Sequence, residues 1–529
     1  MSYAKHVQAK KTAQRAPIPG REREMEQMAS GGYAFSMDPF AQLKRFLILG
    51  SEGGSFYVSE QKLTADNAKC VVAAMALDMN RAVDTIIDVS KRGLAPKNKP
   101  ALFALALAFA HANVDQRPIA RRGLYAVART ASDFQFFVNE VNQLRGWGRG
   151  LKHAIGDWFQ NLTADDLAYQ AFKYQAREGW SLADVLRKSH PKFEHEVAAK
   201  NAIAHWLLKK ELVEGAPARL VAAHECLHAA DAAAAVRLIV DHNLPREVVP
   251  TALLNDKDVW RALLQRMPLH ACIRNLGKMT RVGALENDRT SKDLITSKLT
   301  GDNLRKSRMH PLGILAASVV YEAGRGVKGS LTWAPLRWLI EALENAYHDA
   351  FDNVEPSGKR ILYGIDISGS MAGGRVNGMD FVTAAQVAAS LALAGIKREE
   401  FYDVVGFATS IHRYSITRNS RLNDVIRSWP GIGEGTDCSV PIRWAQSTRT
   451  PFDAIVLVTD GESWAGDRHV SQAIKEYRNS VGIDTKLVIA YTSAQTATLA
   501  DPSDKSSLDI AGFDASMPAL ITNFVKGEV

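Results

Sequence analysis

The sequence predicts two parts, a helical array followed by a doubly wound α/β domain. Between about residues 35 and 345, short apolar segments with helical spacing are separated by Gly, Pro or Asn, without the alternation typical of strands. Beyond about residue 355, short apolar runs typical of strands alternate with stretches typical of helices. Such alternation indicates right-handed crossovers and a mostly parallel sheet. The expected fold class is therefore α plus α/β.

Individual segments support the helical array. The apolar stretch Ala101–Ala112 follows Pro100 and predicts a buried helix. Ser181 precedes another periodic segment and is followed at the third position by Asp184, a variant of the capping box that starts helices. Helices of this kind are typical of stacked pairs. No fixed repeat period emerges from the sequence, so the pattern alone does not establish a solenoid.

The α/β part has four predicted strands. They cover residues 361–367, 402–408, 453–459 and 486–490, with helices expected near 379–394, 421–429, 468–480 and 516–526. In such sheets, ligands bind beyond the carboxyl ends of the strands. Asp366 and Asp460 both lie at such ends.

Oxygen-bearing side chains gather at these strand ends. Asp366, Ser368 and Ser370 alternate as the chain enters a Gly-rich turn, and a carboxylate with two hydroxyls suits Mg²⁺. A second Gly-rich loop presents the Thr436 hydroxyl next to Asp437, and Asp460 follows another apolar strand. A single Asp in such a place usually caps a turn, but three segments in this order favour a metal site. Without a nucleophile beside a base, we expect a binding or structural site and no enzyme activity.

Charge is divided unevenly between the two parts. The chain carries a net charge of +8, and residues 355–529 hold 17 basic and 20 acidic residues, so the first 354 residues carry +11. This excess favours an acidic partner, with nucleic acid as the first choice. The first 27 residues are basic and poor in large apolar groups, so a flexible arm is expected there.

Cysteine usage and hydropathy predict a reduced, cytoplasmic protein that does not enter the membrane. The four cysteines are far apart and lack metal-ligand spacing. No run reaches the roughly 18 apolar residues that span a bilayer. The basic, polar residues 1–12 do not resemble a secretory signal.

One short motif points to different chemistry. His224, Glu225 and His228 fit the H-E-x-x-H pattern, which on a helix places two zinc-binding imidazoles beside a general base. The pattern is short enough to arise by chance, and no glycine-spaced third histidine follows. We therefore interpret this segment as an ordinary helix and keep a zinc hydrolase as a minor alternative.

Basic residues cluster between residues 145 and 192. If residues 144–158 form one helix, then Arg145, Arg149, Lys152 and His153 share a face. Further basic groups follow at Lys173, at Arg177 and from Arg187 to Lys192, interleaved with Trp and Tyr. This combination suits phosphate contacts and base stacking, although a solvated basic face is the simpler alternative.

Several longer motifs resemble one family. They are Arg45–Tyr57, Tyr174–Trp180, Leu186–His190, Arg274–Thr280, Met309–Pro311 and Val354–Arg360, the last leading into the Asp366 motif. These stretches resemble the TROVE module, and the oxygen-rich strand ends resemble the metal-ion-dependent adhesion site of a von Willebrand factor A domain. Together they are similar to the sixty-kilodalton Ro autoantigen family, as a bacterial or phage-borne member.

The resemblance implies a ring of HEAT-like helical pairs over residues 28–354, closed by an A domain over residues 355–529. It implies that Asp366, Ser368, Ser370, Thr436 and Asp460 surround a divalent cation, most simply Mg²⁺. It also implies that Lys173, Arg177 and His190 bind Y-like noncoding RNA.

Further partners follow from the same resemblance. Single-stranded 3′ ends of misfolded RNA are expected in the ring cavity, and an exoribonuclease is expected to join through the RNA. The function implied is quality control or degradation of noncoding RNA. The alternative is a metal-dependent, adhesion-type protein scaffold without an RNA function.

Overall fold

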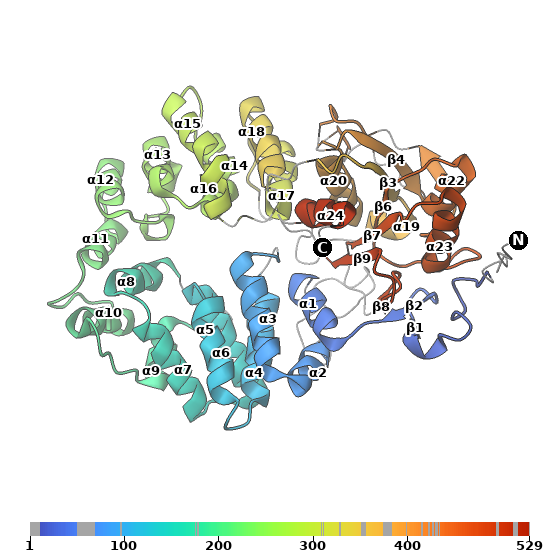
Figure 1. Ribbon diagram of the computed structural model, residues 1–529. Coiled ribbons are helices and arrows are strands. Elements are labelled where there is room, and N and C mark those ends of the chain that lie inside the picture. The colour runs from blue at the N-terminus through green and yellow to red at the C-terminus, as the bar shows by residue number, and fades with distance from the viewer. Residues whose placement is uncertain are drawn as a thin grey trace, which may run out of the picture.

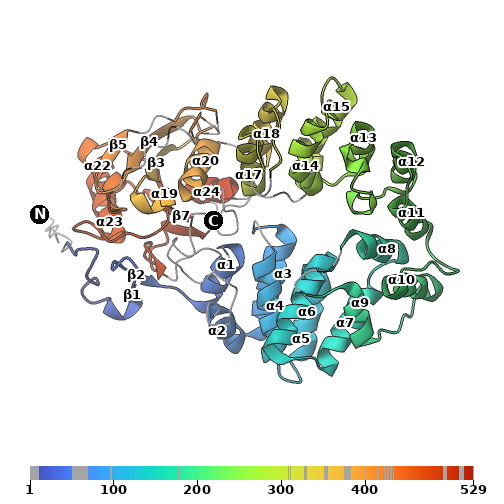
Figure 2. The same cartoon turned by 180° about the vertical axis from the view of Figure 1, so that it is seen from behind.

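The computed structural model describes residues 11–49, 69–95, 98–174, 176, 179–307, 309, 311–326, 330–350, 356–373, 383–397, 399–413, 416–421, 424–425, 428, 432, 434–492, 497–511 and 517–527. Figure 1 shows helices following one another in an arc, with a mixed α/β domain beside both ends of that arc. The view from behind in Figure 2 shows the same arrangement. The two-part fold class predicted from the sequence is confirmed.

The arc begins at α1 and ends at α18. Its helices are α1 (Pro39–Leu49), α2 (Lys69–Leu77), α3 (Met79–Arg92), α4 (Lys99–His111), α5 (Arg117–Val127), α6 (Ala131–Arg145), α7 (Arg149–Gln160), α8 (Ala164–Lys173), α9 (Leu182–Ser189), α10 (Val197–Lys209), α11 (Ala218–Leu227), α12 (Ala232–His242), α13 (Lys257–Arg266), α14 (Leu269–Arg281), α15 (Arg289–Lys298), α16 (Gly301–Lys306), α17 (Pro311–Glu322) and α18 (Arg337–Asp349). Short 3₁₀ turns, η3 (Arg246–Val248) and η4 (Leu253–Asn255), lie between α12 and α13. Helix α3 packs against α5, α4 against α6, and α5 against α7, as in stacked helical pairs.

Local signals in the sequence set several helix boundaries. The predicted start at Ser181 is confirmed, because its hydroxyl accepts from Asp184 N and the Asp184 carboxylate accepts from Ser181 N. Helix α3 starts at the cap Asp78 and ends at Gly93, whose φ of 67° is easy only for a residue without a side chain. Helix α4, predicted as buried, is enclosed along most of its length.

The C-terminal domain contains a six-stranded sheet in the order β5-β4-β3-β6-β7-β9. Its elements are β3 (Arg360–Asp366), α19 (Gly369–Gly373), α20 (Ala384–Ile396), β4 (Phe401–Phe407), β5 (Ile411–Arg413), α22 (Val440–Thr448), β6 (Ala454–Thr459), α23 (Val470–Val481), β7 (Lys486–Tyr491), β9 (Ser507–Ala511) and α24 (Met517–Lys526). All neighbouring strands are parallel except for β5, which pairs antiparallel with β4 at one edge. The predicted mostly parallel sheet is therefore present.

Side chains of alternate strand residues build two apolar layers. Along β3, Ile361, Tyr363 and Ile365 join the layer that includes α20 and α24, and this layer is continuous with the core of the helical arc. Leu362 joins the opposite layer, which includes α22 and α23. This division follows from the two-residue period of strands. The sequence did not reveal β5, β9 or α22, and the helix expected at 421–429 lies partly outside the described residues.

The segment predicted as a flexible arm is instead packed on the C-terminal domain from residue 11 onwards. Strands β1 (Met25–Gln27) and β2 (Tyr33–Ser36) pair with each other, and β2 also pairs with β8 (Ala497–Thr498). Gln14 is fully buried and donates from Nε2 to Arg468 O (3.1 Å). Composition alone missed this because the segment is ordered by pairing with a distant strand. An additional short 3₁₀ turn, η1 (Glu22–Glu24), precedes β1.

Two contacts attach the ends of the arc to the C-terminal domain. At the first end, Arg45 of α1 donates from Nη2 to both carboxylate oxygens of Asp509 on β9 (2.5 and 2.6 Å). The Arg45 guanidinium also lies 4.3 Å from the ring centroid of Tyr491. At the other end, the buried side chain of Tyr347 on α18 forms a hydrogen bond with Ser390 of α20. None of the described helices is long and apolar enough to cross a membrane.

We expect Arg45→Ala to lower the free energy of unfolding by about 3–5 kcal/mol, because it leaves Asp509 without the buried cation that it faces. Urea unfolding followed by circular dichroism would measure this loss. The control is Arg289→Ala, since the Arg289 side chain is 94% exposed and its ion pair lies on the surface. Equal stabilities of the two variants would contradict the role assigned to Arg45.

Candidate functional site

The predicted metal residues of β3 and β6 lie close together. Asp366 ends β3, and its Oδ2 accepts a hydrogen bond of 2.6 Å from Thr459 Oγ1 at the end of β6. Its Oδ1 accepts from Ser368 N at 2.9 Å. The hydroxyl oxygens of Ser368 and Ser370 are 3.2 Å apart. The parallel register of β3 and β6 thus brings the two motifs to one edge of the sheet.

The third predicted segment reaches the same edge. Gly369 N donates to Glu434 O (3.4 Å), which places the loop of Thr436 beside the turn after β3. Thr436 is buried, and its carbonyl oxygen accepts from the backbone of Trp464 and Ala465, in the loop after Asp460. The five residues expected around a cation therefore come from three segments that contact one another.

The neighbouring acid Asp437 has a different role. Its Oδ2 accepts from Arg443 Nη2 at 2.6 Å, and its Oδ1 accepts from both the backbone and the hydroxyl of Ser439. These contacts occupy the carboxylate and stabilise the start of α22. Asp437 thus supports the Thr436 loop.

Burial affects the ionisation of the two carboxyl groups at this edge of the sheet. Asp366 and Asp460 are fully buried, and this burial raises the pKa of each carboxyl group. The charge of Asp366 adds to the effect at Asp460, whose pKa is raised to about 7. A bound cation would reverse this tendency, because it favours both ionised forms.

The donor set fits a hard divalent cation. It offers carboxylates and hydroxyls, which Mg²⁺ prefers, and includes only two carboxylates. No cluster of three or more His, Cys, Asp or Glu side chains suited to a metal occurs within the described ranges. A site here would therefore depend on the hydroxyls of Ser368, Ser370 and Thr436.

The H-E-x-x-H segment has a simpler structural explanation. Helix α11 ends at Leu227, so His228 lies just beyond it, and the imidazole rings of His224 and His228 meet edge to face with centroids 5.3 Å apart. His224 Nδ1 accepts a hydrogen bond from Trp206 Nε1 at 3.3 Å. These contacts agree with the interpretation of an ordinary helix.

The basic stretch from residue 144 to 158 is not one helix, so the predicted shared face is wrong in its geometry. Helix α6 ends at Arg145 and α7 begins at Arg149, because Gly146 adopts a φ of 80° between them. Arg145, Arg149 and Lys152 are nevertheless all exposed. The relative positions of these three side chains therefore depend on the turn between α6 and α7.

The other three predicted RNA-binding residues differ in their environments. Lys173 ends α8, and its Nζ donates to the Tyr169 hydroxyl at 2.9 Å and lies 5.4 Å from the Tyr174 ring centroid. Burial is the largest influence and lowers the pKa of the Lys173 ammonium group, but the hydrogen bond to Tyr169 and the electrostatic effects of Tyr174, Tyr169 and Glu247 together outweigh it, so the pKa is raised. His190 is exposed in a left-handed conformation with a φ of 49°. Arg177 lies outside the described residues.

An aromatic pair connects two of the basic clusters, and the sequence did not reveal it. The rings of Trp147 and Trp180 stack with centroids 5.4 Å apart and planes 12° from parallel. The ammonium group of Lys188 on α9 lies 5.2 Å from one ring centroid and 5.1 Å from the other. The sequence showed that Trp residues alternate with basic residues in this region. Only the tertiary fold shows that Trp147 stacks on Trp180.

Comparison with known proteins identifies the family. The profile described as the TROVE domain matches residues 26–219 and 217–319, and the one described as the Ro60 vWA domain matches residues 360–525. The chain belongs to the Ro60 family. It is 36% identical to an RNA-binding protein RO60 of Deinococcus radiodurans over 515 residues, covering 96% of both chains. It is 31% identical to the RNA-binding protein RO60 of Caenorhabditis elegans, covering 94% of this chain and 90% of that one.

A solved structure agrees with the sequence comparison. The crystal structure of the Deinococcus radiodurans RO (RSR) protein superposes with a TM-score of 0.70 and 36% identity, covering 93% of this chain and all of that one. The Ro60 family is a non-enzymatic family of RNA-binding proteins. The predicted resemblance to the Ro family is confirmed.

The candidate metal site can be tested directly. At pH 8, above the pKa of Asp460, we expect Mg²⁺ at a hundred times its Kd to stabilise the protein by about 2.7 kcal/mol. Asp366→Asn should abolish this stabilisation, because it removes one of the two carboxylates. Chemical unfolding with and without Mg²⁺ would measure the difference. Asp302→Asn, at a site 76% exposed on α16, is the control, and an equal Mg²⁺ effect in both variants would exclude Asp366 as a ligand.

Proposed function

We propose that this Ro60-family protein binds small noncoding RNA of the Y type on a basic outer surface of its helical ring. The observation that carries the proposal is the Lys188 contact with both Trp147 and Trp180, which joins the basic cluster of α7 to that of α9. Cationic groups on adjoining elements suit the phosphates of a folded RNA, which proteins recognise mainly by shape and backbone. The two RNA-binding relatives support the same function.

Lys173, Arg177 and His190 are the residues that we assign to the Y-type RNA, with Arg145, Arg149 and Lys152 as further phosphate contacts. The net charge of +11 on the first 354 residues favours such a partner. The raised pKa of Lys173 keeps its ammonium group charged although the group is partly buried. A cation held in place by tyrosines loses little conformational freedom when it meets a phosphate.

The proposal extends to misfolded RNA. Its single-stranded 3′ end would enter the cavity of the ring, and an exoribonuclease would join through the bound RNA. The protein would then act in quality control or degradation of noncoding RNA, in the cytoplasm. The support for these finer statements is the family resemblance, which covers both parts of the chain.

The proposal also includes a Mg²⁺ site that is separate from the RNA-binding surface. We assign Asp366, Ser368, Ser370, Thr436 and Asp460 as the residues that would hold Mg²⁺. When bound, the ion would supply positive charge at a buried edge that carries two carboxylates. The residues themselves position one another through the hydrogen bonds of Asp366 with Ser368 and Thr459.

The second candidate function is a metal-dependent protein scaffold without an RNA role. The observation that favours it is the gathering of the adhesion-type residues at one edge of the sheet. It predicts a protein partner that EDTA releases, whereas the RNA proposal predicts a small RNA that remains bound in EDTA. Purification from the host at moderate salt, followed by sequencing of bound nucleic acid, would separate the two.

We expect Lys173→Ala to weaken binding of a Y-type stem-loop RNA and to reduce the slope of log K against log salt by about 1, because one phosphate contact is lost. Fluorescence anisotropy over a salt series would measure both effects. Lys257→Ala is the control, since Lys257 is an exposed lysine at the start of α13. An unchanged slope in Lys173→Ala would remove Lys173 from the interface.

A further inference from the structure

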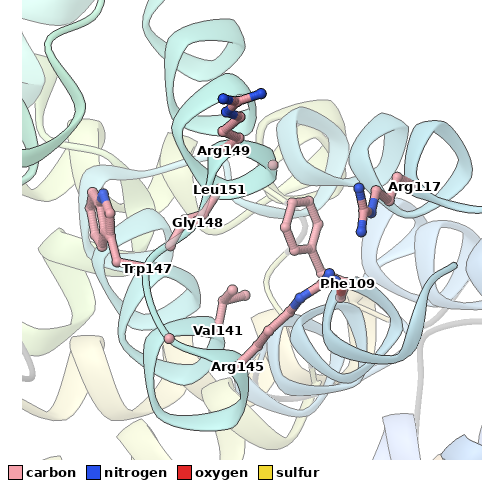
Figure 3. A pocket seen from close by; sticks show the side chains of 10 residues that line it. Phe109, Arg117, Val141, Arg145, Trp147, Gly148, Arg149 and Leu151 are labelled. Carbon is pink, nitrogen blue, oxygen red and sulfur yellow. Dashed lines mark hydrogen bonds between the residues drawn. The ribbon is translucent and has the colours of Figure 1, made fainter. Parts of the chain in front are cut away.

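A pocket lies where α4, α6 and α7 meet. Its lining includes Phe109 at the end of α4, Val141 and Arg145 of α6, and Arg149 and Leu151 of α7, together with Arg117 and the turn from Gly146 to Gly148. Figure 3 shows the arginines around the opening, with Trp147 on the side away from Arg117. The cavity encloses about 170 Å³, far more than the roughly 15 Å³ that a single water needs.

The floor of the pocket is apolar and its rim is cationic. Phe109, Val141 and Leu151 are buried, with exposures of 5%, 1% and 2%. Arg117 and Arg149 at the rim are exposed to solvent. A ligand that fits both surfaces has a flat apolar part and a negatively charged group.

The pocket arginines differ from their neighbours in their charge environment. Arg121 and Arg122 of the same helix as Arg117 pair with Asp157 (2.9 Å) and Asp84 (2.7 Å). Arg117, Arg145 and Arg149, in contrast, form no ion pair with a carboxylate in the described part of the chain. Arg145 is held in place because its Nη1 donates to Phe109 O at 3.1 Å. These guanidinium groups therefore remain available to an external anion.

The start of α7 adds further donors to the same pocket. Gly148 is the N-cap of α7, and no side chain caps the helix there. Gly148, Arg149, Gly150 and Leu151, which form the start of this helix, all line the pocket. The first N–H groups of a helix attract anions, and here they meet three arginines at a cavity.

We propose that this pocket binds one unpaired nucleotide of a bound RNA. The phosphate lies between the arginines and the start of α7, and the base lies against the apolar floor. A base within a duplex is stacked on both faces and cannot reach such a floor, whereas an unpaired base can. The inference rests on the proposed RNA function and adds Arg117, which no sequence pattern indicated, as a residue that selects unpaired RNA.

The test compares two probes by fluorescence anisotropy at moderate salt. One is a blunt RNA hairpin closed by a compact loop whose bases are stacked, and the other is the same hairpin with a single-stranded oligouridine extension. Arg117→Gln should weaken binding of the extended hairpin about tenfold, as for the loss of one charge-assisted contact. Binding of the blunt hairpin should change less than about twofold. Arg122→Gln on the same helix is the matched control, with the same change in charge, and should alter neither probe.

A second pair of variants tests the pocket without removing an arginine. Gly148 has an extended backbone (φ −136°, ψ 174°), and no atom lies within 4 Å of the position that a Cβ would take. Gly148→Asp and Gly148→Asn should therefore both fold, because both residues are good N-caps. The carboxylate of Gly148→Asp should weaken binding of the extended hairpin more than the isosteric amide of Gly148→Asn does.

The outcomes separate this inference from the proposed function. Equal effects of Arg117→Gln and Arg122→Gln, equal losses on both hairpins, or equal effects of the two Gly148 variants would each overturn the pocket assignment while RNA binding itself stands. A wild-type protein that binds neither hairpin would overturn the proposed function, and the pocket assignment with it.

Discussion

The Arg45–Asp509 pair is the contact on which the closed arrangement of this protein depends. The helices of the arc each contact mainly their neighbours, so small errors in their packing would add up along the chain. An ion pair that is largely removed from solvent, in which Nη2 of Arg45 donates to both carboxylate oxygens of Asp509, fixes the first helix against the last strand of the sheet. Tyr347 and Ser390 fix the other end. With both ends attached to one domain, the basic groups along the arc keep defined positions.

The same sheet supports the candidate metal site. Its parallel register places the ends of β3 and β6 side by side, and that register brings two carboxylates into one buried place. Ionisation of both is unfavourable there without a cation, as the raised pKa of Asp460 reflects. The first strands of the chain pack on this domain as well, so both ends of the sequence contribute to its stability.

Sequence reasoning succeeded where a local signal decides the structure. The cap at Ser181 and the apolar strand before Asp366 needed only their neighbours in the chain, and both were found. It was less successful where distant contacts decide. The segment around Gln14 looked like a flexible arm because its burial depends on residues near 468. The turn at Gly146 divided a stretch whose basic periodicity had suggested a single helix.

The sequence by itself determined the fold class, the family and the residue types of the candidate metal site, because these depend on periodicity and on motifs whose members are close in the chain. Only the tertiary structure decided how the basic groups are arranged. Lys188 lies over Trp147 and Trp180 because α9 packs against α7, and Arg117 reaches the turn before α7 because α5 packs there too. Such contacts between side chains on different helices depend on helix packing, which no spacing within one segment specifies.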